Sequence, residues 1–386
     1  MTLFQDVAFF VLLAVLLVPA FFLGLTEEKR GSGNTRAWYI LAASVLFDAL
    51  AIGRDPEHIL FFLLYLLWET LTVSVYVRIR QKSGRKGKIY AVFLILSIVP
   101  LVLSKVSGFF PVHLFQVLGI SYLTFKSAQV VIEIYDGVIT QVNPVDFISF
   151  LVFFPGILSG PIDRSRRYLE DLKKTQSREE YLALAGDGLF KLMLGMLYKF
   201  VLAAVCYQGV QFFSDSFGFP AQAGYAYCYG VYMFFDFAGY SLMAVGVSYL
   251  LGIRTPDNFR QPFLSRDIRE FWDRWHITLS YWFRDFLFTR FVMQSMRHKW
   301  FKDRLQTACA GFLVDMFVMG IWHGLAPNYL LYGLYHGALL ALNEIFQKKS
   351  KFYKKNKKKK WYQALSWAVT MQLVMFGFLL FSGHLV

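Results

Sequence analysis

The chain has 386 residues, of which 56% are hydrophobic and only 17% are charged, and its formal net charge is +14. A soluble globular protein usually carries about 25% charged residues, so this chain has too little polar surface for a soluble fold. The composition indicates an integral membrane protein that crosses the bilayer many times.

Apolar stretches near the length of about 20 residues that a membrane helix needs predict an all-α, polytopic fold. We expect about eleven spans, at 7–25, 36–53, 59–77, 89–104, 112–135, 145–160, 182–213, 223–252, 304–322, 329–346 and 362–384. The first has no basic residue before it and no cleavage-like site after it, so we interpret it as a retained span. Residues 145–160 can also form a re-entrant piece, and residues 182–213 one long or broken helix.

Basic residues gather in the loops between these stretches. Residues 78–88 hold six of them and residues 348–360 hold nine lysines, and neither run contains an acid. Positive charge beside spans marks the cytoplasmic side, so we place these loops in the cytoplasm and both termini outside. This pattern favours membrane topology over nucleic-acid binding as the reason for the net charge.

Two stretches do not have the pattern of simple spans. Residues 153–164, which include Ser159, contain two prolines and two glycines. Non-helical backbone at membrane depth requires surrounding protein or a wet cavity. Residues 266–296 place Trp272, Trp275 and Trp282 on one helical stripe with charged residues around it. We predict amphipathic helices there, at the cytoplasmic interface or dipping inward.

Three of the seven histidines have unusual surroundings. His276 follows Trp275, while His323 and His336 each precede a glycine in an apolar run. Ionisable side chains at membrane depth are costly and are often functional. In one interpretation, each is a neutral histidine that is hydrogen-bonded to a neighbouring helix. Alternatively, one imidazole acts as the base in acyl transfer to a hydroxyl and a second group orients the donor or stabilises the oxyanion.

The sequence lacks the motifs of zinc, serine-hydrolase and dithiol sites. The sequence contains no H-E-x-x-H zinc motif, no G-x-S-x-G elbow and no C-x-x-C pair. We therefore predict no metal site. Asp236 and Asp315 stand in apolar runs, where a buried carboxylate needs a partner or a proton. They either bond neighbouring helices or line a reaction path.

Four strings, at 153–164, 234–246, 258–288 and 319–324, together resemble the membrane-bound O-acyltransferase family. Residues 120–137 resemble the branch that D-alanylates teichoic acid in Gram-positive bacteria. The resemblance implies a funnel-like helical core within one membrane domain, 1–386. We divide this domain into N-terminal helices (1–140), a motif-bearing core (141–346) and a Lys-rich loop with the last helix (347–386).

The resemblance also implies the site. His323 stands in the W-H-G motif as the catalytic residue, and His276 ends the W-x-x-W-[HN] motif as the second polar residue, where many relatives have asparagine. His336 lies outside both motifs. Supporting or path-lining roles are expected for His336, Asp236, Asp315, Trp322, Trp275 and Ser159.

The family branch transfers D-alanine from the phosphopantetheine arm of a cytoplasmic carrier protein, so the resemblance implies no bound cofactor. Further implied partners are other membrane or extracellular-facing D-alanylation proteins, with teichoic acid as final acceptor. A basic cytoplasmic surface suits an acidic carrier. We predict carrier docking at Phe291, Val292 and Met293, where a lipid-facing interfacial helix is the alternative.

Three other functions are alternatives for this sequence. The chain can be an acetyltransferase for an exported polysaccharide, like the alginate-modifying branch, although those relatives tend to be longer. It can be a transporter without chemistry, with the broken segment 153–164 as a gate. A scaffold in an envelope complex is the third, but it leaves the motif histidines unexplained.

Overall fold

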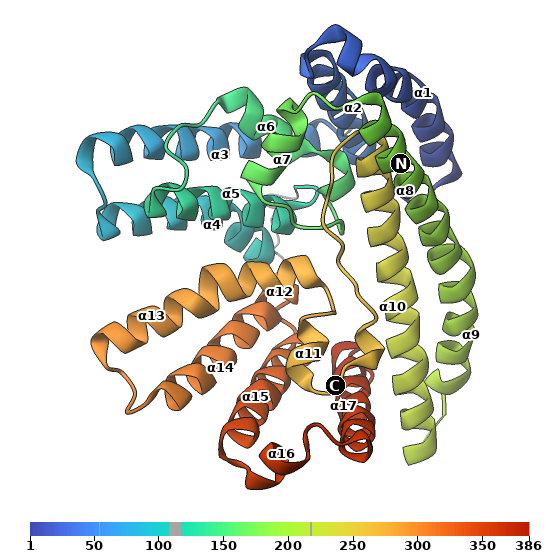
Figure 1. Ribbon diagram of the computed structural model, residues 1–386, viewed down its shortest axis with the longest axis vertical. Helices are drawn as coiled ribbons and strands as arrows, with labels where there is room; N and C mark the ends of the chain where they lie inside the picture. Colours follow the sequence, from blue (N-terminus) through green and yellow to red (C-terminus); the bar gives the residue numbers. More distant parts are fainter. Residues whose placement is uncertain (54, 108–116, 217, 386) are drawn as a thin grey trace. The chain divides into compact units, whose positions relative to one another are not determined.

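The computed structural model describes residues 1–53, 55–107, 117–216 and 218–385, and these residues form helices joined by loops, without a strand (Figure 1). Arg54, residues 108–116, Phe217 and Val386 lie outside this description. His113 and the start of the predicted span 112–135 therefore fall outside the described residues as well.

The chain divides into two compact units. Unit 1 comprises Met1–Met196 and Tyr240–Pro256, and unit 2 comprises Leu197–Gly239 and Asp257–Val386. The long helix α10 (Phe219–Leu250) contributes to both. The division differs from the boundaries expected at residues 140 and 346, and the single domain stays a prediction.

Unit 1 contains eight helices among its described residues. These are α1 (Val7–Arg30), α2 (Asn34–Ile52), α3 (Pro56–Ser83), α4 (Gly87–Ser107), α5 (Ile120–Asp136), α6 (Pro144–Val152), α7 (Ser165–Lys173) and α8 (Arg178–Met196).

Unit 2 begins with a π-helical turn, η2 (Leu197–Leu202), which continues α8 into α9 (Ala203–Ser214). After α10, unit 2 continues with short helices and then with longer ones. They are α11 (Ile268–Trp272), α12 (Ile277–Phe283), the π-helical turn η4 (Arg284–Phe288), α13 (Thr289–His298), α14 (Arg304–His323), α15 (Pro327–Lys349), α16 (Lys351–Asn356) and α17 (Lys360–Phe381).

Within the described ranges, eight helical stretches are long and apolar enough to cross a membrane. They are α1, α2, α3, α4, the continuous Arg178–Ser214 stretch, α10, α14 and α17. The prediction of a multi-pass membrane protein is confirmed, but the count of eleven spans is not. The predicted spans at 112–135 and 329–346 correspond to α5 and α15, which are not among the eight.

The predicted span 145–160 is instead a short helix followed by irregular backbone. α6 ends at Val152, and the chain then makes one 3-10 turn, Phe154–Gly156, before α7. Lys126 of α5 donates to the carbonyls of Phe150 and Leu151, both at 3.1 Å. A cation at this end of a helix bonds carbonyls that have no partner within the helix.

Contacts with two helices hold this segment. Gln81 of α3 donates to the carbonyl of Thr140 at 2.7 Å, just before α6. Lys173, at the end of α7, pairs with Asp146 at the start of α6. The chain from α6 to α7 thus returns close to the point at which it begins, and the re-entrant alternative stays a prediction.

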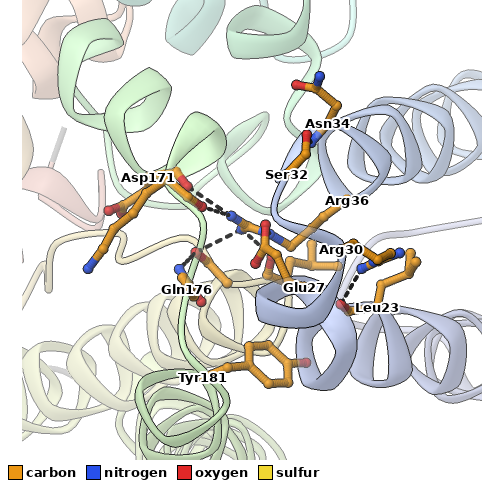
Figure 2. Close-up of polar contacts among 12 residues, drawn as sticks. Leu23, Glu27, Arg30, Ser32, Asn34, Arg36, Asp171, Gln176 and Tyr181 are labelled. Atoms are coloured by element: carbon orange, nitrogen blue, oxygen red, sulfur yellow. Dashed lines mark hydrogen bonds and ion pairs between the residues drawn. The ribbon is translucent and has the colours of Figure 1, made fainter.

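A buried arginine joins α1 to two loops of unit 1. Arg36 is 2% exposed, and its Nε donates to the Glu27 carboxylate at 3.1 Å. Figure 2 shows its guanidinium pointing into the loop between α7 and α8. Its other four N–H groups donate to backbone carbonyls, those of Asp171, Lys174, Leu251 and Gly252. All five donors of this buried cation are therefore used.

Candidate active site

His276 occupies an uncommon backbone conformation at the start of α12. Its φ is 44° and its ψ is 52°, in the left-handed region. Non-glycine residues adopt this region rarely, and such outliers concentrate at functional sites. The side chain is 3% exposed, and the Phe237 ring stands edge-on to it at 4.7 Å. The backbone turn thus directs an imidazole into the interior of unit 2.

Asn258 holds this turn in place. Its backbone carbonyl accepts from the N–H of Ile277 at 2.8 Å. Its side-chain Oδ1 accepts from the Thr278 hydroxyl at 2.6 Å and from the Thr278 N–H at 3.3 Å. Because Asn258 and Thr278 are both buried, these bonds are shielded from water. They fix the residues that immediately follow His276.

His323 is the last residue of α14 and is half-buried. Aromatic rings surround it, with centroids at 4.6 Å for Trp322, 5.1 Å for Phe381 and 6.2 Å for Tyr332. The next residue, Gly324, has no room for a side chain, since a Cβ there would lie 2.4 Å from the Tyr329 ring. The glycine of the W-H-G motif therefore allows Tyr329 to pack beside the histidine.

The helices that carry His323 and His336 approach closely and lie side by side (Figure 1). A Cβ on Gly320 of α14 would lie 2.6 Å from the Tyr329 carbonyl, and one on Gly333 of α15 would lie 2.4 Å from the Met316 carbonyl. Small residues at such contacts let membrane helices pack backbone to backbone. Gly320 and Gly333 therefore allow α14 and α15 to pack closely.

His276 and His323 influence each other electrostatically. His276 lies outside the eight candidate spans. Burial lowers the pKa of its imidazole below the ordinary value, and the charge of His323 adds to this effect. A neutral imidazole carries one donor and one acceptor. His276 is therefore suited to donate or accept a hydrogen bond rather than to carry charge.

His336 is enclosed by packing instead. It is 1% exposed, and Trp272 Nε1 donates to its Nδ1 at 3.4 Å. Its Nε2 lies only 2.4 Å from the place where a Cβ on Gly377 of α17 would stand. Tyr332 packs against both His336, at 4.6 Å, and His323. These contacts suit the supporting role that we predict for His336.

The two predicted carboxylates have different surroundings. Asp236 Oδ1 pairs with Lys199 Nζ at 2.5 Å, across η2 and α10. Lys199 is not among the predicted site residues, although a lysine within an apolar run is a signal from which it could have been predicted. Asp315 accepts a hydrogen bond from the backbone of Phe288, at the end of η4, and lines a cavity of about 350 Å³. Among the described residues, Asp236 thus has a cationic partner and Asp315 does not.

The remaining predicted site residues lie in three places. Trp275 is buried in an aromatic cluster and stacks on Phe271 at 5.6 Å. Trp322 lies against His323 in unit 2. Ser159 belongs to unit 1, where its side chain is hydrogen-bonded to Tyr122.

The predicted docking residues on α13 do not share one environment. Met293 is 59% exposed, while Phe291 is half-buried and its ring lies 5.9 Å from that of Trp300. Val292 lines the same cavity as Asp315. Exposed apolar surface at this place also comes from Met296 and Trp300. Docking at α13 stays a prediction.

No group of three or more His, Cys, Asp or Glu side chains in the described part of the chain is arranged to hold a metal ion. A His-led site with aromatic walls and a neutral buried imidazole is suited to moving a proton during acyl transfer.

A sequence profile of the membrane-bound O-acyltransferase family matches residues 103–382. The chain belongs to this family. Members are acyltransferases by the family's own description, so the resemblance of the motif strings is confirmed. The motif histidines and the aromatic residues around His323 lie within the matched region.

Among curated proteins, the chain is 40% identical to the teichoic acid D-alanyltransferase of Bacillus subtilis (strain 168), over 99% of this chain and 98% of that protein. It is also 40% identical to the Streptococcus thermophilus protein of the same name, over 98% and 94% of the two chains. A probable alginate O-acetylase of Pseudomonas syringae is 31% identical over 70% of this chain. The chain spans about half the length of that acetylase.

Proposed function

We propose that this protein transfers D-alanine from a phosphopantetheine thioester on a carrier protein toward teichoic acid in the cell envelope. The observation that carries the proposal is the 40% identity to the Bacillus subtilis D-alanyltransferase, which extends over nearly the whole of both chains. The buried His276 and the half-buried His323 supply the groups that such a transfer needs.

In the proposed reaction, His323 is the general base. It accepts the proton of an acceptor hydroxyl while the hydroxyl oxygen forms a bond to the thioester carbonyl carbon. The carbon–sulfur bond then breaks, and the leaving thiolate takes the proton back from the imidazolium. His276, kept neutral by burial, would orient the donor or donate a hydrogen bond to the developing oxyanion.

The carrier protein would dock on the cytoplasmic face, and both chain termini would face outside. The support is the concentration of lysine and arginine in the loops at 78–88 and 348–360. Such a surface would steer an acidic carrier toward the membrane. Exposed Met293 on α13 is the most accessible of the three proposed docking residues.

Acetyl transfer to an exported polysaccharide is the second candidate, because an alginate acetylase is 31% identical over 70% of this chain. Its support is weaker, since the similarity spans only half of that longer protein. The two candidates differ in the acyl group that reaches the envelope polymer.

The test supplies cells with labelled D-alanine or labelled acetate and follows each label into the envelope polymer. We expect D-alanine to reach teichoic acid, and we expect His323→Ala to abolish this incorporation. His298→Ala is the matched control, because His298 is an exposed histidine at the end of α13. Incorporation of acetate alone would contradict the proposal, as would unchanged D-alanine transfer by His323→Ala at normal expression.

A further inference from the structure

A second feature of unit 2 is the cavity of about 350 Å³ lined by residues of α11, α12, η4, α13, α14 and α15. This volume is within the range of about 300–1,000 Å³ that is usual for small-molecule sites. Neither His276 nor His323 lines it. The walls of the cavity are therefore distinct from the two motif histidines, and the chemistry of a ligand can be inferred from those walls.

The charges in this cavity are arranged by depth. Arg269 and Arg284, with side chains 60% and 50% exposed, lie at the accessible side. The buried wall is apolar and includes Met316, Met319 and Leu340. Asp315 lies on the same buried wall and is 8% exposed. Two guanidinium groups are thus at the mouth, each paired with a carboxylate, Arg269 with Glu344 at 3.5 Å and Arg284 with Asp285 at 3.1 Å, and the Asp315 carboxylate is at depth.

Asp315 has unused capacity to accept hydrogen bonds. One bond comes from the backbone of Phe288, but its Oδ1 is buried without a hydrogen-bond partner in the described structure. The other two acidic side chains that line the cavity either have a cationic partner or are less buried. Glu344 pairs with Lys348 at 2.8 Å and with Arg269 at 3.5 Å, and Asp273 is only half-buried. A buried acceptor of this kind calls for a donor from a ligand.

We propose that Asp315 recognises the α-ammonium group of an aminoacyl thioester as the carrier's arm passes through this cavity. The inference rests on the proposed function, which brings a D-alanyl group on a phosphopantetheine arm to unit 2. That donor carries an anionic phosphate at its outer end and a cation at its acyl end. The cavity has the complementary order, with arginines outside and a carboxylate inside.

Recognition at Asp315 precedes the chemical step. Asp315 lies eight residues before His323 on α14, or about 12 Å along the helix at 1.5 Å per residue. An ammonium held at Asp315 keeps its neighbouring thioester away from His323. Met319, one turn from His323, also lines the cavity. Asp315 therefore selects aminoacyl over simple acyl donors on the way to the site.

The test compares two donors on the same carrier protein, D-alanyl and propionyl thioesters, which differ only by the ammonium group. Transfer kinetics are measured with the full chain in proteoliposomes. Asp315→Asn keeps an acceptor for the Phe288 backbone and removes the charge. We expect it to lower kcat/KM for the D-alanyl donor by about 10- to 100-fold, mainly through KM, and to leave the propionyl donor unchanged. Asp315→Glu should restore part of the preference.

Asp303→Asn is the matched control. Asp303 caps the same helix by accepting from the N–H of Gln306 at 2.8 Å, and asparagine caps equally well. An equal loss for both donors in Asp315→Asn, or no change for either, overturns the inference while the proposed function stands. A wild-type protein that moves no D-alanine overturns the proposed function, and the inference with it.

Discussion

The Arg36 cluster of unit 1 and the histidine site of unit 2 use buried polar groups in opposite ways. Arg36 is a side chain that holds backbone, since four of its five donors bond carbonyls from two separate loops. At His276 the backbone holds the side chain, through a left-handed turn bonded to Asn258. The difference distinguishes a polar group whose bonding is saturated by the fold from one positioned for a reactant.

The largest effect on activity is expected at His323. His323→Ala should lower the transfer rate by about 100- to 10,000-fold, because it removes the general base. The thermal unfolding midpoint in detergent should change little, since the side chain is only half-buried. Steady-state transfer and a melting curve on the same preparation check both parts. A variant that unfolds instead would show that His323, like Arg36, mainly stabilises the fold.

The opposite effect, a loss of stability without a loss of activity per folded molecule, is expected for Arg36→Ala. It leaves the Glu27 carboxylate, which is 0% exposed, without its cation. Breaking a buried pair in this way typically costs about 3–5 kcal/mol. We expect a much lower unfolding midpoint, while the protein that remains folded transfers at a normal rate per molecule. Arg30→Ala, at the exposed end of α1, is the control for loss of positive charge. Equal unfolding midpoints for the two variants would refute the interpretation that Arg36 stabilises the fold through its five hydrogen bonds.

A smaller effect is expected at Gly377, which tests whether His336 supports the site by packing. Gly377→Ala places a methyl group 2.4 Å from His336 Nε2. Overpacking of this kind costs about 1–3 kcal/mol, so the midpoint should fall and the transfer rate should fall with it. Gly186→Ala, where nothing lies within 4 Å of the added Cβ, is the control. Melting and activity that are both unchanged would show that His336 is loosely held.

The smallest effect concerns pH and His276. Burial lowers the pKa of His276 in the folded protein, whereas the unfolded chain keeps the ordinary value of 6.5. Below that value the unfolded state binds the extra proton, so stability should fall as pH decreases, by at most about 1.4 kcal/mol per pH unit. Above it the contribution is constant.

His276→Asn should flatten this dependence. Melting curves of both proteins between pH 5 and pH 8, values set about the ordinary histidine pKa of roughly 6.5, measure the difference. If the unfolding midpoints of the two proteins change with pH in the same way, His276 is charged in the folded protein. It would then resemble Arg36 rather than a neutral hydrogen-bonding group.

Much of the molecule follows from local sequence. The hydropathy of residues 7–25 or 59–77 is sufficient to predict a membrane helix, because burial in lipid depends on one stretch of chain. The prolines and glycines at 153–164 predict broken backbone in the same way, and the 3-10 turn Phe154–Gly156 lies there. Two short motifs around His276 and His323 indicate the family.

Other features depend on residues that are distant in the chain. Asp236 pairs with Lys199, 37 residues away, and Trp272 bonds His336, 64 residues away. No periodicity in either segment specifies these partners. The return of the chain from α6 to α7 likewise depends on contacts with other helices, because the composition of 145–160 alone also suits a span.

By itself, the sequence determined that the chain is an integral membrane protein, belongs to an acyltransferase family and carries two motif histidines. Only the tertiary structure decided which carboxylate has a cation and which retains an unused acceptor, and that His276 occupies a left-handed turn. The reason is physical. Hydropathy and motifs are properties of neighbouring residues, whereas burial, pairing and cavity walls arise when separate helices pack together.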